Sequence, residues 1–177
     1  MIDKYGFLLE KAKYFAISVH ANQKYAKYFP YEYHLSKVGA NLWLAGFGNY
    51  DTNINSMNVC CAGWLHDCIE DAGVSYNDIA REFNNQIAEI VYAVTNELGK
   101  NRTERNKKTY PKIKNNEYAI CVKLADRIAN VEFSLQSGEM ISKYREEYKL
   151  FKKSLYDKKN QTNESEYLWR ELDNLLK

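Results

Sequence analysis

The stretch MNVCCAGWLHDCIED, residues 57–71, is almost wholly apolar until it reaches His66-Asp67. A helix that is apolar on most sides belongs in the centre of a domain, so we expect it to run to about residue 69 at the core. The end of this stretch carries His66, Asp67, Glu70 and Asp71. Residues three or four positions apart share one face of a helix, so these side chains can point toward one cleft. A divalent cation would compensate their buried charge, whereas a solvent-exposed helix end would need no cation.

The rest of the chain has the pattern of an all-α protein. Its 177 residues include only two prolines, and apolar residues recur at helical spacing along most of its length. We therefore expect residues 1–177 to form a single-domain, multi-helix bundle. The expected segments are a first helix over about 3–20, a second from Pro30 to Gly46, a polar loop over 49–55, a long apolar helix capped by Asn115, and closing helices within about 139–177.

Composition excludes several classes of protein. The formal net charge is only +2, and no apolar run approaches the roughly 20 residues that cross a bilayer. The first residues have no basic-then-apolar signal layout, so we expect a cytoplasmic protein without a membrane partner. The four cysteines contain no C-x-x-C pair, and we expect them to be buried free thiols rather than a disulfide or zinc framework.

Two further sites in the sequence carry metal-competent side chains. Asp126 lies within the apolar run 122–128, with Asn130 on the same helical face, and His34 follows Pro30 at the start of a helix. An acid among apolar residues is not simply solvated. Together with His66 and Asp67, these side chains offer mixed nitrogen and oxygen donors, which suit Mn²⁺, Fe²⁺ or Zn²⁺.

These residues resemble the HD superfamily of metal-dependent phosphohydrolases, whose H…HD…D order is here His34, His66-Asp67 and Asp126. The resemblance extends to the (p)ppGpp hydrolase branch, which comprises the hydrolase domain of RelA/SpoT-type enzymes and the small alarmone hydrolases. It is carried by a core of about 12–135, through residues 20–24, 30–34, 65–71, 94–96 and 122–130.

The resemblance implies a function for the chain and a role for each motif. His34, His66, Asp67 and Asp126 would hold one Mn²⁺, and Glu70 and Asp71 would position and deprotonate the attacking water. Asn130 would contact the nucleotide sugar. The expected reaction is removal of the 3′-pyrophosphate from (p)ppGpp or a related alarmone, by a chain that is a hydrolase only.

The sequence departs from the family pattern where the nucleotide would be read. Tyr25 stands where alarmone hydrolases carry an arginine that stacks on guanine, and Phe133 stands where they usually have threonine. We expect Lys24 and Tyr25 to contact the substrate. A tyrosine face stacks on any purine, so this difference indicates weaker preference for guanine.

A basic segment lies between Lys100 and Lys114, where only Glu104 opposes the lysines and arginines. Lys100, Arg102, Arg105 or Lys107 could hold the distal phosphates of the substrate, and we expect Arg102 and Lys107 to do so. The alternative is that the segment is a solvated helix face.

Three other functions remain open from the sequence. The chain could be a nucleotide phosphatase that acts on NADPH or a deoxynucleotide, with the same chemistry. It could instead be a nucleic-acid-binding module, although its near-neutral charge and lack of a binding motif favour a small-molecule nucleotide partner. A non-catalytic regulatory HD domain is the third possibility, and the presence of every ligand candidate argues against it.

Overall fold

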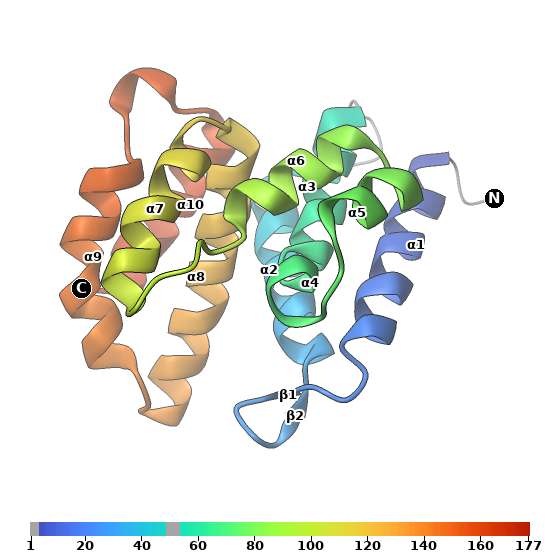
Figure 1. The fold of residues 1–177 in the computed structure, drawn as a ribbon. Helices are drawn as coiled ribbons and strands as arrows, with labels where there is room; N and C mark the ends of the chain where they lie inside the picture. Colours follow the sequence, from blue (N-terminus) through green and yellow to red (C-terminus); the bar gives the residue numbers. More distant parts are fainter. Residues whose placement is uncertain (1–3, 49–53) are drawn as a thin grey trace.

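The computed structural model describes residues 4–48 and 54–177 of the chain, and this part is all-helical apart from one short hairpin (Figure 1). Its elements are α1 (Lys4–Val19), β1 (Lys24–Tyr25), β2 (Phe29–Pro30), α2 (Glu32–Leu44), α3 (Ile54–Leu65), α4 (Cys68–Asp71), α5 (Tyr76–Glu82), α6 (Asn85–Val94), α7 (Arg102–Lys114), α8 (Glu117–Ser137), α9 (Ile141–Leu155), the 3₁₀ helix η1 (Lys158–Asn160) and α10 (Asn163–Leu175). The all-α prediction is confirmed. Most of the loop expected over 49–55 lies outside the described residues.

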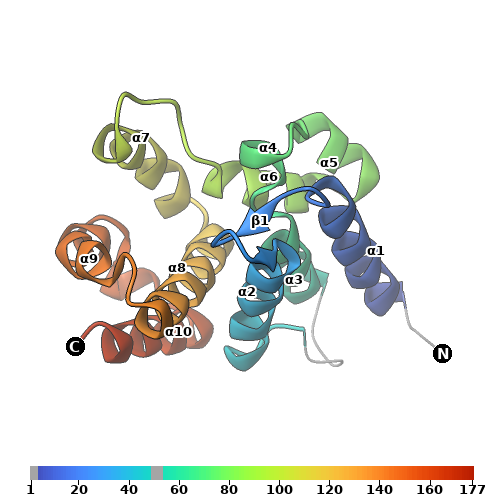
Figure 2. The same ribbon diagram turned by 90° about the horizontal axis from the view of Figure 1, so that it is seen from below.

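Two helices form the centre of the bundle. The apolar helix α3 packs against α1, α2, α6 and α8, and nearly all of its residues are buried, as its sequence predicts. The long helix α8 contacts α2, α3 and α6 on one side and α7, α9 and α10 on the other. Figure 2 shows α8 between these two groups. Elements far apart in sequence therefore meet along α8.

The helix expected to run through residue 69 is interrupted at the His-Asp pair. Helix α3 ends at Leu65, His66 and Asp67 lie in a turn, and the short α4 begins at Cys68. Asp67 is the residue before α4, with φ −97° and ψ −2°. Neighbouring residues of a continuous helix point about 100° apart, whereas this turn lets both side chains face α2 and α8.

A β-hairpin joins α1 to α2, which the sequence reading missed. Lys24 pairs with Pro30 and Tyr25 with Phe29 in antiparallel register. The turn between them places Ala26 and Lys27 in the left-handed region, at φ 48° and 70°. Neither residue type favours that conformation, and each strand is too short to show alternation, so the hairpin has no clear sequence signal.

The start of α8 differs by one residue from the expected cap. Asn116, not Asn115, accepts hydrogen bonds through its side chain from the backbone N–H groups of Tyr118 and Ala119. Asn115 instead ends α7. At the other end, Gly138 has φ 74°, a left-handed conformation that a glycine adopts without strain, and it closes α8.

The basic segment forms α7, and part of its charge serves the fold. The Lys112 ammonium donates to the carbonyls of Tyr92 and Thr95 at the end of α6 and pairs with Glu97 at 2.6 Å. Lys108 pairs with Glu104. Cations at a helix C-terminus stabilise its unpaired carbonyls, so Lys112 holds the end of α6 against α7, whereas the Lys108–Glu104 pair lies within α7.

The remaining composition-based expectations concern cysteines and membranes. All four cysteines are free and buried, as predicted. Across the described ranges, no helix combines the length and apolar character needed to span a bilayer.

Candidate metal centre and cleft

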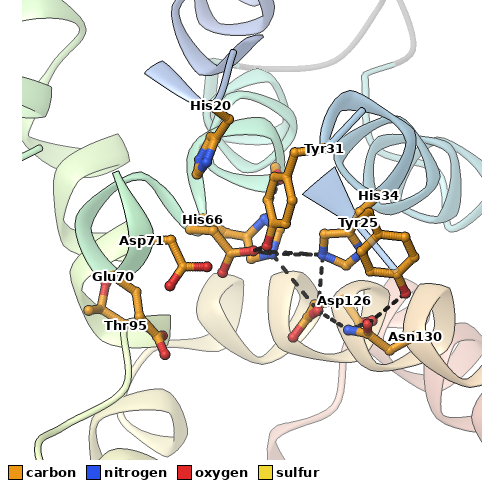
Figure 3. A network of polar contacts seen from close by, with 12 residues as sticks. His20, Tyr25, Tyr31, His34, His66, Glu70, Asp71, Thr95, Asp126 and Asn130 are labelled. Atoms are coloured by element: carbon orange, nitrogen blue, oxygen red, sulfur yellow. Dashed lines mark hydrogen bonds and ion pairs between the residues drawn. The ribbon is translucent and has the colours of Figure 1, made fainter. Parts of the chain in front are cut away.

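Four side chains from three elements meet at the centre of the bundle (Figure 3). His34 comes from the first turn of α2, His66 and Asp67 from the turn after α3, and Asp126 from the middle of α8. The Nε2 atoms of His34 and His66 are 3.3 Å apart. The Asp126 Oδ1 lies 3.4 Å from the His34 Nε2 and 3.8 Å from the His66 Nε2.

The donor atoms are spaced as the ligands of one cation would be. The His66 Nε2 is 2.9 Å from the Asp67 Oδ2, and ligand atoms of His34, His66 and Asp67 lie within 4.8 Å of one another. Two ligands about 2.1 Å from a common cation, on adjacent coordination positions, are roughly 3.0 to 3.4 Å apart. These three residues therefore form a possible divalent-metal site, and Asp126 lies beside it.

The orientation of His66 fits a metal ligand. Its Nδ1 lies 2.9 Å from the Gly63 carbonyl oxygen, which can only accept, so Nδ1 carries the proton and donates. The neutral ring then presents the Nε2 lone pair to the cluster. Metal-binding histidines are commonly fixed by such a bond from the other ring nitrogen to a carbonyl.

The local field at the cluster favours positive charge. Burial alone would lower the pKa of His66, but the Asp67 and Asp126 carboxylates raise it to about 9. Burial alone would raise the pKa of Asp126, but the Lys123 ammonium, 2.8 Å from Oδ2, and the two imidazoles hold it well below its usual range. Two buried carboxylates that draw a proton onto His66 would equally attract a divalent cation, in competition with that proton.

The two acids expected to act on water lie on α4 beside the cluster. Both Glu70 carboxylate oxygens accept hydrogen bonds from Asn96, from its backbone N–H at 3.1 Å and its side-chain amide at 3.0 Å. The Asp71 Oδ2 accepts from the Gln23 amide at 3.2 Å. Burial, and then the nearby Asp67 charge, raise the pKa of Asp71. A carboxylate whose pKa is raised binds a proton more tightly than an ordinary carboxylate does, and is therefore the stronger base.

A cleft of about 280 Å³ opens beside the cluster and is lined by opposite charges. Glu70 and Asp71 line it from α4. The basic residues that line it, from α7 and α8, are Arg102, Arg105, Lys123 and Arg127. Tyr25, Tyr31, Asn96, Asn130 and Tyr144 complete most of the lining. A polyanion entering the cleft would meet the cations of α7 and α8 as well as the acids of α4.

Glu147 of α9 already partners two of these arginines. Its carboxylate lies 2.8 Å from the Arg102 Nε and 3.2 Å from the Arg127 Nη1. Arg105, in contrast, has no acidic partner among the residues that the structure describes. Arg105 is therefore the lining arginine whose charge is least compensated within the protein.

The expected substrate residues divide into two groups. Arg102, Tyr25 and Asn130 line the cleft, although the hydroxyl of Tyr25 and the amide of Asn130 bind each other. Lys107 lines a separate cleft between α7 and α9, beside Tyr110, Pro111 and Leu150. Lys24 is exposed and is absent from the lining. The structure does not bring these two lysines to the metal-ligand candidates.

Several lining residues were given no role from the sequence. Tyr31 donates a hydrogen bond from its hydroxyl to Asp67, and Asn96 holds Glu70. Lys123 pairs with Asp126 at the spacing of three residues, which a helical reading could have found. Arg127 carried no such signal, because its place in the cleft depends on how α8 packs. Arg105 was one of four basic residues that the sequence offered for the distal phosphates, and the packing of α7 brings it to the cleft.

Comparisons with known proteins find pyrophosphohydrolases among the sequence relatives of the chain. No family model matches the chain. It is 35% identical over 153 residues to a probable guanosine-3′,5′-bis(diphosphate) 3′-pyrophosphohydrolase of Mycoplasma genitalium, covering 77% of this chain and 20% of that protein. It is 30% identical over 129 residues to a guanosine-3′,5′-bis(diphosphate) 3′-pyrophosphohydrolase of Aquifex aeolicus, covering 70% of this chain and 17% of that protein. The chain thus spans about a fifth of the length of these relatives.

A solved structure matches almost the whole fold. It belongs to a study titled as showing that a metazoan ortholog of SpoT hydrolyzes ppGpp, and it covers 95% of this chain and 93% of its own with a TM-score of 0.72 and 24% identity. The chain therefore shares the fold of this structure. In sequence it is related to the (p)ppGpp 3′-pyrophosphohydrolases over 70 to 77% of its own length.

Proposed function

We propose that the chain hydrolyses a nucleotide phosphoester with a divalent cation, removing the 3′-pyrophosphate of (p)ppGpp or a related alarmone. The observation that carries this proposal is the cleft beside His34, His66, Asp67 and Asp126, which is lined by the acids of α4 and by cations of α7 and α8. The names of the sequence relatives supply the substrate class.

The four ligand candidates would hold one cation, and we propose Mn²⁺. Two imidazoles and two carboxylates also suit Fe²⁺ or Zn²⁺. When bound, such a cation stabilises charge on phosphoryl oxygens and lowers the pKa of a nearby water. Tyr31, donating to Asp67, and Lys123, 2.8 Å from Asp126, keep the two carboxylates oriented for it.

Within the proposed reaction, Asp71 takes the proton of the attacking water. Its raised pKa and its position on the cleft wall support that role. Glu70 has both carboxylate oxygens engaged by Asn96, so it orients water or substrate more than it accepts a proton. The arrangement divides the two expected roles between the two acids.

The basic residues that line the cleft would bind the substrate phosphates. Arg105 has no acidic partner in the described part of the chain and lines the cleft, so its fork of donors is available to a phosphate. Arg102 also lines the cleft, but it shares the Glu147 carboxylate with Arg127. We therefore assign the main phosphate contact to Arg105, and a supporting one to Arg102.

A second candidate substrate class is another phosphorylated nucleotide, such as NADPH or a deoxynucleotide. It is favoured by Tyr25, which stands where alarmone hydrolases carry a guanine-stacking arginine and whose hydroxyl is bound to Asn130 at 2.9 Å. The metal-ligand candidates and acids are compatible with either substrate. Only the base-reading part of the site separates the two.

A substrate panel with Mn²⁺ present tests the proposal. The panel holds ppGpp, ppApp, NADPH and dGTP, and each reaction is followed for pyrophosphate and for orthophosphate. We expect pyrophosphate release from ppGpp, with ppApp also cleaved. Orthophosphate release from NADPH or pyrophosphate-free turnover of dGTP, with both alarmones untouched, would establish the second candidate instead.

A further inference from the structure

Tyr25 contacts one metal-ligand candidate, His34, directly and reaches a second, Asp126, through Asn130. Its ring stacks on the His34 imidazole, with centroids 5.0 Å apart and planes 15° from parallel. Its hydroxyl donates to the Asn130 Oδ1 at 2.9 Å, and the Asn130 Nδ2 donates to the Asp126 Oδ1 at 2.6 Å. Figure 3 shows this path from Tyr25 through Asn130 to Asp126.

The direction of these hydrogen bonds is fixed by chemistry. An ionised Asp126 carboxylate can only accept, so the Asn130 amide must turn its nitrogen toward it. The same nitrogen also reaches the backbone carbonyl of Asp126 at 3.0 Å. The amide oxygen of Asn130 then faces Tyr25, whose hydroxyl must donate. Every group in the path has one role, and the oxygen of Asp126 so held is the one nearest His34.

The surroundings of the Tyr25 ring leave little of it for a nucleotide base. One face lies on His34, the edge of Phe133 approaches with centroids 4.9 Å apart, and Tyr33 lies tilted at 6.0 Å. Its hydroxyl is occupied by Asn130. Tyr25 is half-buried and lines the cleft, but one face of its ring and its hydroxyl are already engaged by His34 and Asn130.

We propose that Tyr25 is a positioning residue for the metal centre, holding His34 by stacking and Asp126 through Asn130. This inference rests on the proposed metal-dependent function. This role would take the place of the base stacking expected of Tyr25. The hairpin would then support the metal centre, because β1 carries Tyr25 and the chain leaving β2 carries Tyr31, which donates to Asp67. Groups that orient metal ligands typically change metal affinity tenfold to a hundredfold when removed.

Mn²⁺ affinity of the metal-free chain is the measurement that tests this role, by titration calorimetry at one pH. Tyr25→Phe keeps the stacked ring and removes only the hydroxyl, and we expect roughly fivefold weaker binding, the size of one lost hydrogen bond. Asn130→Ala removes the direct partner of Asp126, and we expect about tenfold weaker binding. Tyr28→Phe is the matched control, because Tyr28 is 83% exposed at the tip of the same hairpin, and its affinity should equal that of the parent.

A double variant separates the relay from a general loosening of the hairpin. If Tyr25 acts through Asn130, then Tyr25→Phe adds little in the Asn130→Ala background, whereas independent effects would multiply. Circular dichroism and thermal unfolding of the metal-free variants confirm that each is folded. Equal Mn²⁺ affinity in the parent and Tyr25→Phe, or multiplied effects in the double variant, would overturn the inference alone. A parent that binds no Mn²⁺ would overturn the proposed function, and this inference with it.

Discussion

At the scale of single residues, the proposed metal site depends on two carboxylates that the fold keeps charged at the centre of the bundle. Asp67 and Asp126 are each held by a neighbouring donor, Tyr31 and Lys123 respectively, and each faces an imidazole. Leaving such charges unpaired in a protein interior is costly, so their partners and a cation stabilise the same arrangement.

Removing one ligand candidate should abolish stoichiometric metal binding. We expect one Mn²⁺ per chain in the parent after loading, and much less than one in Asp67→Ala, because Asp67 supplies the oxygen 2.9 Å from the His66 Nε2. Elemental analysis after gel filtration measures the ratio. An undiminished metal content in Asp67→Ala would show that the cation binds elsewhere.

Asp71→Asn should retain the metal and lower kcat by about a hundredfold or more, which is the usual size of a general-base effect. A base works when deprotonated, so the rate should fall as pH drops through the raised pKa of Asp71, which lies above the ordinary value near 4. In Asp71→Asn this acid limb should disappear. The pH dependence of kcat for both proteins is the measurement, and an unchanged limb would move the base role to Glu70.

Residue types and order sufficed to predict the candidate ligands, but not what surrounds them. His66, Asp67 and Asp126 stand out because they follow or lie within apolar runs, whereas His34 was added by the H…HD…D order of the family that the sequence resembles. Arg105 and Lys107 were both candidates for the substrate phosphates, because nothing in the basic segment distinguishes them. Which of the two faces the cleft is decided by the packing of α7 against α8 and α9.

At the scale of elements, α7 separates cations with different roles. Arg105 lines the cleft, whereas Lys107 lines the cleft between α7 and α9. We expect Arg105→Ala to raise KM for ppGpp by about tenfold or more, because it removes a charge-assisted contact to phosphate. Lys107→Ala is the matched control and should change KM little. Equal effects of the two variants would indicate a general field of the basic segment rather than a contact.

The cap of α8 gives a stability test with a neighbouring control. Asn116 accepts two backbone hydrogen bonds at the start of α8, whereas Asn115 is exposed and ends α7. We expect Asn116→Ala to lower the free energy of unfolding by about 1 kcal/mol and Asn115→Ala to lower it by much less. Urea unfolding measures both. A larger loss of unfolding free energy in Asn115→Ala than in Asn116→Ala would show that Asn115 is the cap, as the sequence predicted.

The break between α3 and α4 shows where helical periodicity failed as a guide. The apolar run 57–65 predicts the central helix correctly, and the same pattern continues through Cys68 and Ile69. No glycine or proline marks the turn at His66-Asp67. The geometry of the metal-ligand candidates requires the break, because His34 and Asp126 approach from two other helices.

At the scale of the whole molecule, the candidate site is assembled from helices that pack on both sides of α8. The helices before it supply His34, His66 and Asp67, and the helices around its other face supply Arg102, Arg105 and Glu147. The sequence predicted an all-helical bundle because breakers are few and apolar periodicity is long. It could not predict the hairpin or the separate second cleft, which arise from left-handed residues and from helix packing.

The central claim is that this bundle is a metal-dependent hydrolase that removes pyrophosphate from the 3′ position of an alarmone. The most direct measurement incubates ppGpp with the Mn²⁺-loaded parent, with the same protein after chelation, and with Asp67→Ala, and separates the products by anion exchange. We expect GDP and pyrophosphate in equal amounts from the loaded parent only. Intact ppGpp with the loaded parent, or the same products from the chelated protein and Asp67→Ala, would contradict the claim.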